Sequence, residues 1–167
     1  MGGGRPLNAQ AAGGEVSMTL PEGPGPFALA TVEKLGELTV EIAPEKIVEA
    51  CHLLKHTLAF ERLSTVTAVD RYPSAPRFEV VYHLQSIARN QRLRLKCRLP
   101  GENPAIDSAT AVCRSANWFE REVFYVFGIY FRNHPGLRLI LIPDIWSGPP
   151  LPKHSQIPRP TTAAIRN

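Results

Sequence analysis

The stretch RFEVVYHLQSIARNQRLRLKCRLP, residues 77–100, contains two segments in which apolar side chains recur at every second position. In the first segment these positions run from Phe78 to Leu84, and in the second they run from Leu93 to Leu99, between basic residues. Because successive side chains of a strand point to opposite faces, the alternation predicts two strands with one buried and one polar face. The linker IARNQ favours an antiparallel hairpin as their connection.

The segments that flank the hairpin predict further strands and helices. ELTVEI, residues 37–42, is typical of a short strand, and ERLSTVTAVD, residues 61–70, is rich in β-branched side chains. Between them, residues 43–60 carry a proline in the first turn and then apolar side chains at helical spacing. Further along the chain, a second helix is expected to end at Gly128. These elements predict an α+β domain, with an antiparallel or mixed sheet of about four strands packed with helices.

Composition divides the chain into three parts. Residues 1–30 hold seven glycines and four prolines with one aromatic side chain, which predicts a flexible N-terminal tail. Residues 31–142 carry the α+β pattern. Residues 143–160 contain six prolines, which exclude a helix, so we expect residues 143–167 to form an extended proline-rich arm.

Length, charge and cysteine content limit the class of protein. The 167 residues suffice for one domain and its tails, and 19 Lys and Arg against 15 Asp and Glu give a net charge of +4. This small excess fits acidic partner chains, anionic lipid or nucleic acid equally well. Three widely spaced cysteines indicate reduced thiols rather than a disulfide framework. No apolar run approaches the roughly 20 residues that span a bilayer, so membrane contact is expected to be indirect.

NWFEREVFYVFG, residues 117–128, places the charged triplet Glu120, Arg121 and Glu122 before an uncharged aromatic run. On a helix successive side chains lie about 100° apart, so the two glutamates diverge by roughly 200°. Catalytic carboxylate pairs converge on one bond, so this geometry argues against a hydrolase. The remaining side chains are apolar nearly all the way round, whereas a surface helix keeps one polar face. A partner chain is therefore the expected cover for one side, and a folded-back proline-rich arm is the alternative.

The motifs NWFERE, FGI, HPGLR and WSGPPLPK follow one another from Asn117 to Lys153. In order and spacing they resemble the C subunit of bacterial NADH–quinone oxidoreductase, the small peripheral-arm subunit of respiratory complex I, over about three quarters of the chain. The resemblance implies a subunit without catalytic residues or a redox cofactor, which packs against the quinone-site large subunit and the iron–sulfur subunits. NADH, FMN, iron–sulfur clusters and quinone are then expected in those partners. The assembly would lie on the cytoplasmic face of the bacterial cell membrane and couple electron transfer from NADH to quinone to proton translocation.

The family motif, carried over position by position, identifies a set of partner-binding residues. A charged triplet at the rim of an apolar patch fixes the register against a partner, because unpaired buried charges are costly. Gly128 permits the positive φ that turns the chain out of the helix, and Trp146 is expected to anchor in a partner pocket. The full set is Trp118, Glu120, Arg121, Glu122, Gly128, His134, Pro135, Arg138, Trp146 and Lys153.

Departures from the family pattern leave alternatives open. Tyr125 stands where the family usually has Asp, so a pair with Arg121 one turn earlier is missing. The chain therefore serves either a standard complex or a divergent paralogue. The equivalent subunit of an energy-converting hydrogenase is the nearest alternative function, because family members also occur there. A stand-alone basic module that binds RNA is the more distant alternative.

Two further patterns have a simple structural interpretation. A basic stripe consists of Arg92, Arg94, Lys96 and Arg98. We expect a solvated sheet face there, before a docking face for an acidic subunit, and a nucleic-acid site last, since the strand has no aromatic side chain for base stacking. His52 and His56 lie one helical turn apart, but no third ligand accompanies them, so exposed helix residues are expected rather than a zinc site.

Overall fold

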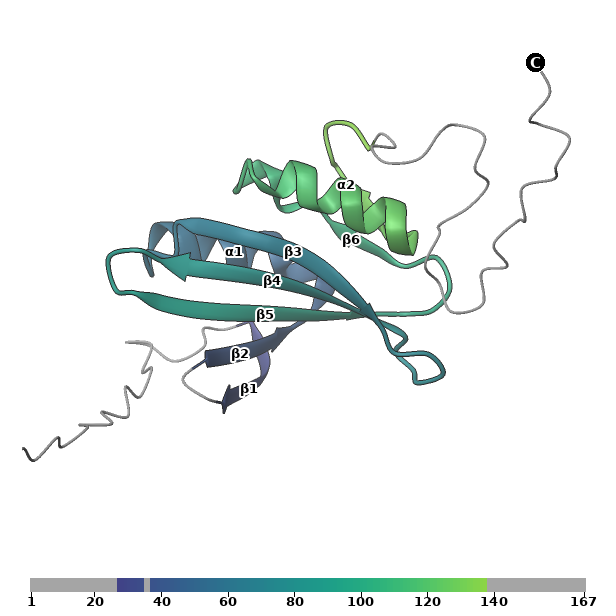
Figure 1. Ribbon diagram of the computed structural model, residues 1–167, viewed down its shortest axis with the longest axis horizontal. Helices are drawn as coiled ribbons and strands as arrows, with labels where there is room; N and C mark the ends of the chain where they lie inside the picture. Colours follow the sequence, from purple (N-terminus) through teal and green to yellow (C-terminus); the bar gives the residue numbers. More distant parts are fainter. Residues whose placement is uncertain (1–26, 35–36, 138–167) are drawn as a thin grey trace, which may run out of the picture.

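The computed structural model of the protein describes residues 27–34 and 37–137 (Figure 1). Within these residues it contains seven strands, two α-helices and two short 3₁₀ helices. In chain order the elements are β1 (Ala28–Lys34), β2 (Glu37–Ile42), η1 (Pro44–Lys46), α1 (Ile47–His56), β3 (Arg62–Asp70), β4 (Phe78–Ser86), β5 (Gln91–Leu99), β6 (Ala105–Asp107), η2 (Ala109–Ala111), α2 (Ala116–Phe127) and β7 (Tyr130–Arg132).

The first five strands form one mixed sheet in the order β1-β2-β5-β4-β3. β2 pairs with β5 in parallel, whereas the other neighbours are antiparallel. The predicted hairpin is β4–β5, whose register runs from Phe78 opposite Leu99 to Ser86 opposite Gln91. The α+β class with a mixed sheet packed by helices is therefore confirmed.

The sheet has five strands, whereas the sequence predicts about four, and the additional strand is β1. This strand begins at Ala28, inside the segment 1–30 that composition assigns to a tail. Six of its seven residues are exposed, so its sequence lacks the alternation that marks a half-buried strand. It pairs with β2 from Ala28 opposite Ile42 to Lys34 opposite Glu37.

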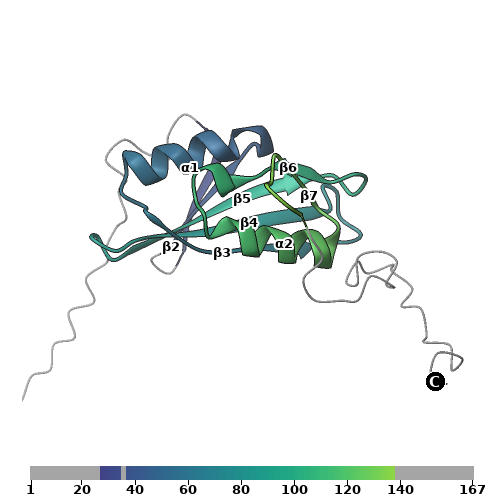
Figure 2. The same cartoon turned by 90° about the horizontal axis from the view of Figure 1, so that it is seen from above.

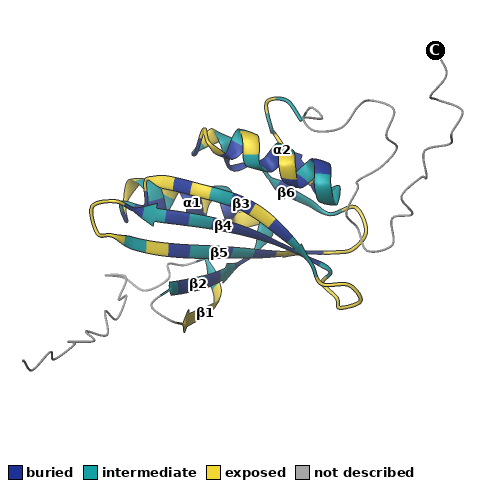
Figure 3. Ribbon diagram, viewed as in Figure 1, coloured by how far each residue is buried: buried dark blue, intermediate teal, exposed yellow. Residues whose placement is uncertain are grey.

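Both α-helices lie on one face of the sheet, and the two-stranded β6–β7 pair lies between them (Figure 2). Buried and less buried positions alternate along β5 (Figure 3). The predicted core positions Val80, Leu84, Leu93 and Leu95 are at most 2% exposed. The core of the domain therefore lies between the sheet and this helical layer.

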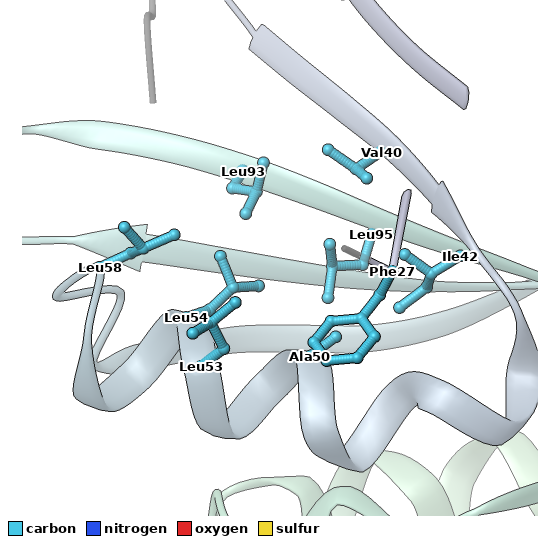
Figure 4. A pocket seen from close by; sticks show the side chains of 9 residues that line it. All are labelled: Phe27, Val40, Ile42, Ala50, Leu53, Leu54, Leu58, Leu93 and Leu95. Atoms are coloured by element: carbon cyan, nitrogen blue, oxygen red, sulfur yellow. The ribbon is translucent and has the colours of Figure 1, made fainter. Parts of the chain in front are cut away.

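α1 packs on the sheet through one stripe of side chains, Ile47, Ala50, Cys51 and Leu54, as its helical spacing predicts. An apolar hollow of about 10 Å³ lies between this helix, β2 and β5 (Figure 4). Such a volume holds about one water molecule at most, and the side chains that line it are all apolar, so it is a packing defect rather than a ligand site. Among the described residues, no helix is long and apolar enough to cross a bilayer.

The other face of the sheet carries the basic stripe, and acidic residues of the same domain pair with it. Three ion pairs cross between strands: Arg94 with Glu37 at 2.6 Å, Lys96 with Glu79 at 3.0 Å, and Arg98 with Glu41 at 2.8 Å. Three of the four basic side chains are thus matched within the sheet, and only Arg92 of the stripe is exposed without an ion pair among the described residues, so the stripe has little free positive charge with which to attract nucleic acid. The face is solvated only in part, because Arg92 and Arg98 are exposed whereas Glu79 and Val81 of β4, which lie opposite Arg98 and Lys96, are buried.

Candidate functional site

α2 carries the charged triplet and packs along β3, the last strand of the sheet. It begins after Ser115 and ends at Gly128, whose φ of 74° is left-handed and favours glycine. The predicted end of the helix is therefore confirmed. Since each residue advances the helix by about 100°, Glu120 and Val123 turn inward and are buried, whereas Trp118 turns outward and is exposed.

Glu120 is fully buried between α2 and the short helix η2. Its carboxylate accepts a hydrogen bond from Ser108 Oγ at 2.5 Å and another from the backbone N–H of Ala109 at 2.8 Å. Burial raises the pKa of Glu120 to about 7, although both hydrogen bonds act in the opposite direction. The carboxylate satisfies a free N–H group at the start of η2 and ties the two helices together.

The structure corrects the expected placement of Glu120 at the rim of an apolar patch. The triplet divides among three environments, since Glu120 is buried, Arg121 is half-buried and Glu122 is exposed. The physical reason is the helical step, which turns three consecutive side chains to three different sides. Glu120 therefore acts inside the domain, and Glu122 is the exposed charge of the triplet.

Other ionisable groups near Glu120 are buried as well. The hydroxyl of Tyr82 has no hydrogen-bond partner among the described residues, and burial, together with the charge of Glu120, raises its pKa. Cys51 and Cys113 are buried free thiols, and burial raises the pKa of both. A protonated, inaccessible thiol is a poor nucleophile and a poor metal ligand. The cluster therefore supports packing better than covalent chemistry.

Arg121 fastens the segment after β7 to α2. Its Nε donates a hydrogen bond to the carbonyl of Gly136 at 2.8 Å. Its guanidinium also lies 5.5 Å from the centre of the Trp118 ring, within the range of a cation–π contact. Arg121 therefore makes its main contacts within the chain, where it holds both the turn and the orientation of an exposed aromatic ring.

His134 makes the second link between this turn and α2. Its Nδ1 accepts a hydrogen bond from the N–H of Gly136 at 3.0 Å, so its proton is on Nε2, which donates to the carbonyl of Asn117 at 3.2 Å. Burial lowers the pKa of His134, against the opposing effect of the bond to Asn117. The neutral ring thus joins the start of α2 to the turn, while the neighbouring Pro135 is exposed.

The outward side of this region is aromatic. Trp118 is 63% exposed, and Tyr130 on β7 is 54% exposed and packs edge-to-face on Phe124 at 6.4 Å between ring centres. Glu122, one helical turn after Trp118, lies on the same side of α2 as that ring and forms no ion pair among the described residues. An exposed aromatic ring beside an unpaired charge is typical of a surface that another chain covers.

Three of the expected contact residues lie outside the described residues. Their roles stay predictions, and they are Arg138, Trp146 and Lys153. Conversely, sequence reasoning did not identify Ser108 and Asn117 as partners of Glu120 and His134. Both contacts join segments far apart along the chain, which the local spacing of residues does not reveal.

The histidine pair on α1 lies at the surface. His52 and His56 are both exposed, as expected, and their ring centres lie 4.4 Å apart. Within residues 27–34 and 37–137, no group of three His, Cys, Asp or Glu side chains is placed to hold a metal ion.

Fold and site together define a class of protein, a small α+β domain that holds an aromatic helix on its sheet and exposes the far side of that helix. The family model described as "Respiratory-chain NADH dehydrogenase, 30 Kd subunit" matches residues 40–161. The chain belongs to this family.

Individual relatives support the same family assignment. The C subunit of the NADH-quinone oxidoreductase of Geobacter sulfurreducens is 49% identical over 119 residues, which cover 71% of this chain and 74% of the relative. The C 2 subunit of the NADH-quinone oxidoreductase of Rhizobium meliloti is 49% identical over 109 residues, which cover 64% of this chain and 58% of that relative. The chain is therefore similar to the C subunits of complex I-type enzymes, and family membership implies other subunits of such a complex as partners.

Two solved structures resemble the fold. A trypsin-resistant fragment (1–134) of Nqo5 has a TM-score of 0.58 at 33% identity and covers 63% of this chain and 86% of its own. A chain of the membrane-bound sulfane sulfur reductase, an archaeal respiratory membrane complex, has a TM-score of 0.63 at 25% identity. That match covers 71% of this chain and 69% of the other.

Proposed function

We propose that the chain is a non-catalytic docking subunit in the peripheral arm of a membrane-attached NADH:quinone oxidoreductase. The outward side of α2 and the segment after it contact the subunits that carry the quinone site and the iron–sulfur clusters. NADH, FMN, iron–sulfur clusters and quinone belong to these partners, which lie on the cytoplasmic face of the membrane. The chain maintains their arrangement while electrons pass from NADH to quinone and protons are translocated.

One observation carries this proposal, the exposure of Trp118 on a helix whose other side is anchored in the domain. Trp118 is 63% exposed, yet Arg121 holds its ring at 5.5 Å, and Arg121 is in turn bonded to Gly136. An ordered aromatic side chain loses little conformational entropy when a partner covers it. Trp and Arg are also the residue types most enriched among those that dominate binding energy at interfaces.

The test compares Trp118→Ala with Ile87→Ala in the full chain, tagged and expressed in cells that make the complex. Ile87 is a matched control, because it is 62% exposed on the distant turn between β4 and β5. We expect both variants to melt within about 2 °C of the parent, since exposed side chains contribute little to stability. Trp118→Ala should reduce recovery of the quinone-site and iron–sulfur subunits from solubilised membranes at least about tenfold, and Ile87→Ala should not.

Equal recovery with both variants would contradict the role of Trp118, and recovery of no oxidoreductase subunit with the parent chain would contradict the function itself. Mass spectrometry of the recovered subunits also tests a second candidate function. The similarity to a chain of the membrane-bound sulfane sulfur reductase favours an equivalent docking role in another membrane-bound redox complex. Energy-converting hydrogenases belong to that group of alternatives. Recovery of subunits of such a complex, in place of a quinone-site subunit, would establish this second function.

A further inference from the structure

The strand β3 has a side along which no described strand lies, although Ser115 Oγ, just before α2, donates a hydrogen bond to the carbonyl of Leu63 at 3.2 Å. β3 is the last strand of the sheet, and no described strand pairs with its outer side. Between Arg62 and Asp70 it has seven uncharged residues, LSTVTAV, without proline or glycine. Proteins usually protect such an edge with charges or prolines, because its free N–H and C=O groups recruit other chains. β1, at the opposite edge, ends in Glu33 and Lys34.

A groove runs between this edge and α2. It has a volume of about 100 Å³, and its lining residues are Thr65, Val66 and Thr67 of β3 and Glu122, Val123, Val126 and Phe127 of α2. Successive residues of a strand point to opposite faces, so a hollow lined by three consecutive residues lies along the edge of the strand rather than over one face. The volume is well below the roughly 300 Å³ of a small-molecule site, and it suits one or two side chains of an added strand.

The charge of the groove indicates what kind of segment fits it. Glu122 lines the groove, is exposed, and has no ion pair among the described residues. The other lining residues are apolar or carry a hydroxyl. A complementary segment therefore has apolar or β-branched side chains and one cation.

The competing occupant of the groove is the chain's own segment 138–142, RLILI, which is apolar and contains one cation. The described chain leaves the domain beside Arg121, to which Gly136 is bonded. At about 100° per residue, Arg121 lies roughly on the opposite side of α2 from Val126 in the groove. Residues 143–160 hold six prolines, which cannot donate to a strand ladder, and residues 1–26 precede β1, which lies at the other edge of the sheet.

We propose that the groove between β3 and α2 receives an extended segment of a partner subunit, which adds to the sheet as a further strand beside β3 and places a Lys or Arg against Glu122. This proposal rests on the docking function proposed above and names the surface that performs it. Main-chain hydrogen bonds to the free edge supply affinity, and the side chains that enter the groove supply selectivity.

The first experiment replaces Thr67, an exposed residue of the groove, with the photoreactive residue benzoylphenylalanine in the full chain, expressed in cells that make the complex. The same replacement at Ile87 is the control. We expect irradiation to join position 67 to a single segment of one subunit that co-purifies stoichiometrically, with a Lys or Arg close to the cross-link. A cross-link to residues 138–167 of the same chain, or no cross-link from position 67 in the purified complex, would overturn the proposal.

The second experiment compares amide hydrogen exchange of the isolated full chain with that of the assembled complex. Every second amide of β3 lacks a bond to β4, so we expect these amides to exchange fast in the isolated chain and at least about tenfold more slowly in the complex. Glu122→Lys should abolish that protection, whereas Glu102→Lys, an exposed acid in the turn before β6, should not. Unchanged exchange of β3 in a complex that still assembles would refute the groove and leave the docking function standing. Failure of the parent chain to assemble would refute the docking function itself.

Discussion

α1 and α2 pack on the same face of the sheet, and both bury apolar side chains, but α2 departs from this pattern at two positions. α1 buries apolar side chains such as Ile47 and Leu54 and exposes polar ones such as His52. α2 buries the carboxylate of Glu120 and exposes the indole of Trp118. α1 is therefore an ordinary amphipathic helix, whereas the proposed function gives α2 a second role on its outer side.

The distribution of side chains in α2 does not favour the stability of the isolated domain. A large apolar side chain left in water forgoes about 1.5–3 kcal/mol of burial free energy. A buried carboxylate costs free energy unless hydrogen bonds compensate for the lost hydration. Two such bonds hold Glu120, but the Trp118 ring stays largely exposed beside Arg121. The difference between the helices supports the proposal that a partner covers the outer side of α2.

The largest expected effect comes from Glu120→Ala, which breaks the inner anchor of α2. The change leaves Ser108 Oγ and the N–H of Ala109 without their acceptor in a buried site. We expect a loss of about 2–4 kcal/mol in the free energy of unfolding at pH 6, or roughly 10 °C in melting temperature. Thermal and urea unfolding followed by circular dichroism measure it. Glu122→Ala, two residues along the same helix, is the control and should change stability by less than about 0.5 kcal/mol. Equal effects of the two variants would show that the buried carboxylate does not stabilise the packing of α2 in the domain.

The next effect in size is a pH dependence that Glu120→Gln should remove. The pKa of Glu120 rises from 4.5 to about 7 on folding, so between these values the folded chain keeps a proton that the unfolded chain has lost. Its contribution to stability therefore falls as the pH rises from about 4.5 to 7, by up to about 3 kcal/mol. His83 and His134, whose pKa values burial lowers, act with the opposite sign in both proteins and cancel in the difference. A difference in unfolding free energy that stays constant from pH 5 to pH 8 would contradict the raised pKa.

The contrast between the helices also marks the limit of what the sequence could predict. Strands β2 to β5 and the end of α2 at Gly128 follow from alternation and from a residue suited to positive φ, which are local signals. β1 has no such signal because it is almost entirely exposed. The burial of Glu120 had one signal, since it shares a helical face with Ala116 and Val123 at spacings of four and three residues. That spacing shows which way the side chain points, but its partner on η2 is a tertiary contact that sequence spacing does not reveal.

The smallest expected effect on stability comes from Arg121→Ala, which separates the two roles of α2. The change removes the hydrogen bond to the carbonyl of Gly136 and the contact with the Trp118 ring. We expect a loss of about 1 kcal/mol in the free energy of unfolding, because Arg121 is half-buried and water can replace it at the carbonyl. Recovery of partner subunits should fall at least about tenfold, since both the ring and the exit of the chain after Gly136 lose their fixed direction.

Arg121→Lys gives the matched comparison for this last prediction. It keeps the positive charge but loses the planar guanidinium that reaches the carbonyl and stacks on the ring, so it should rescue recovery only in part. If Arg121→Ala unfolds the domain while the folded fraction still recovers its partners at the parent level, then Arg121 belongs with the inner anchor of α2. The residues that anchor α2 inside the domain would then include Arg121 as well as Glu120.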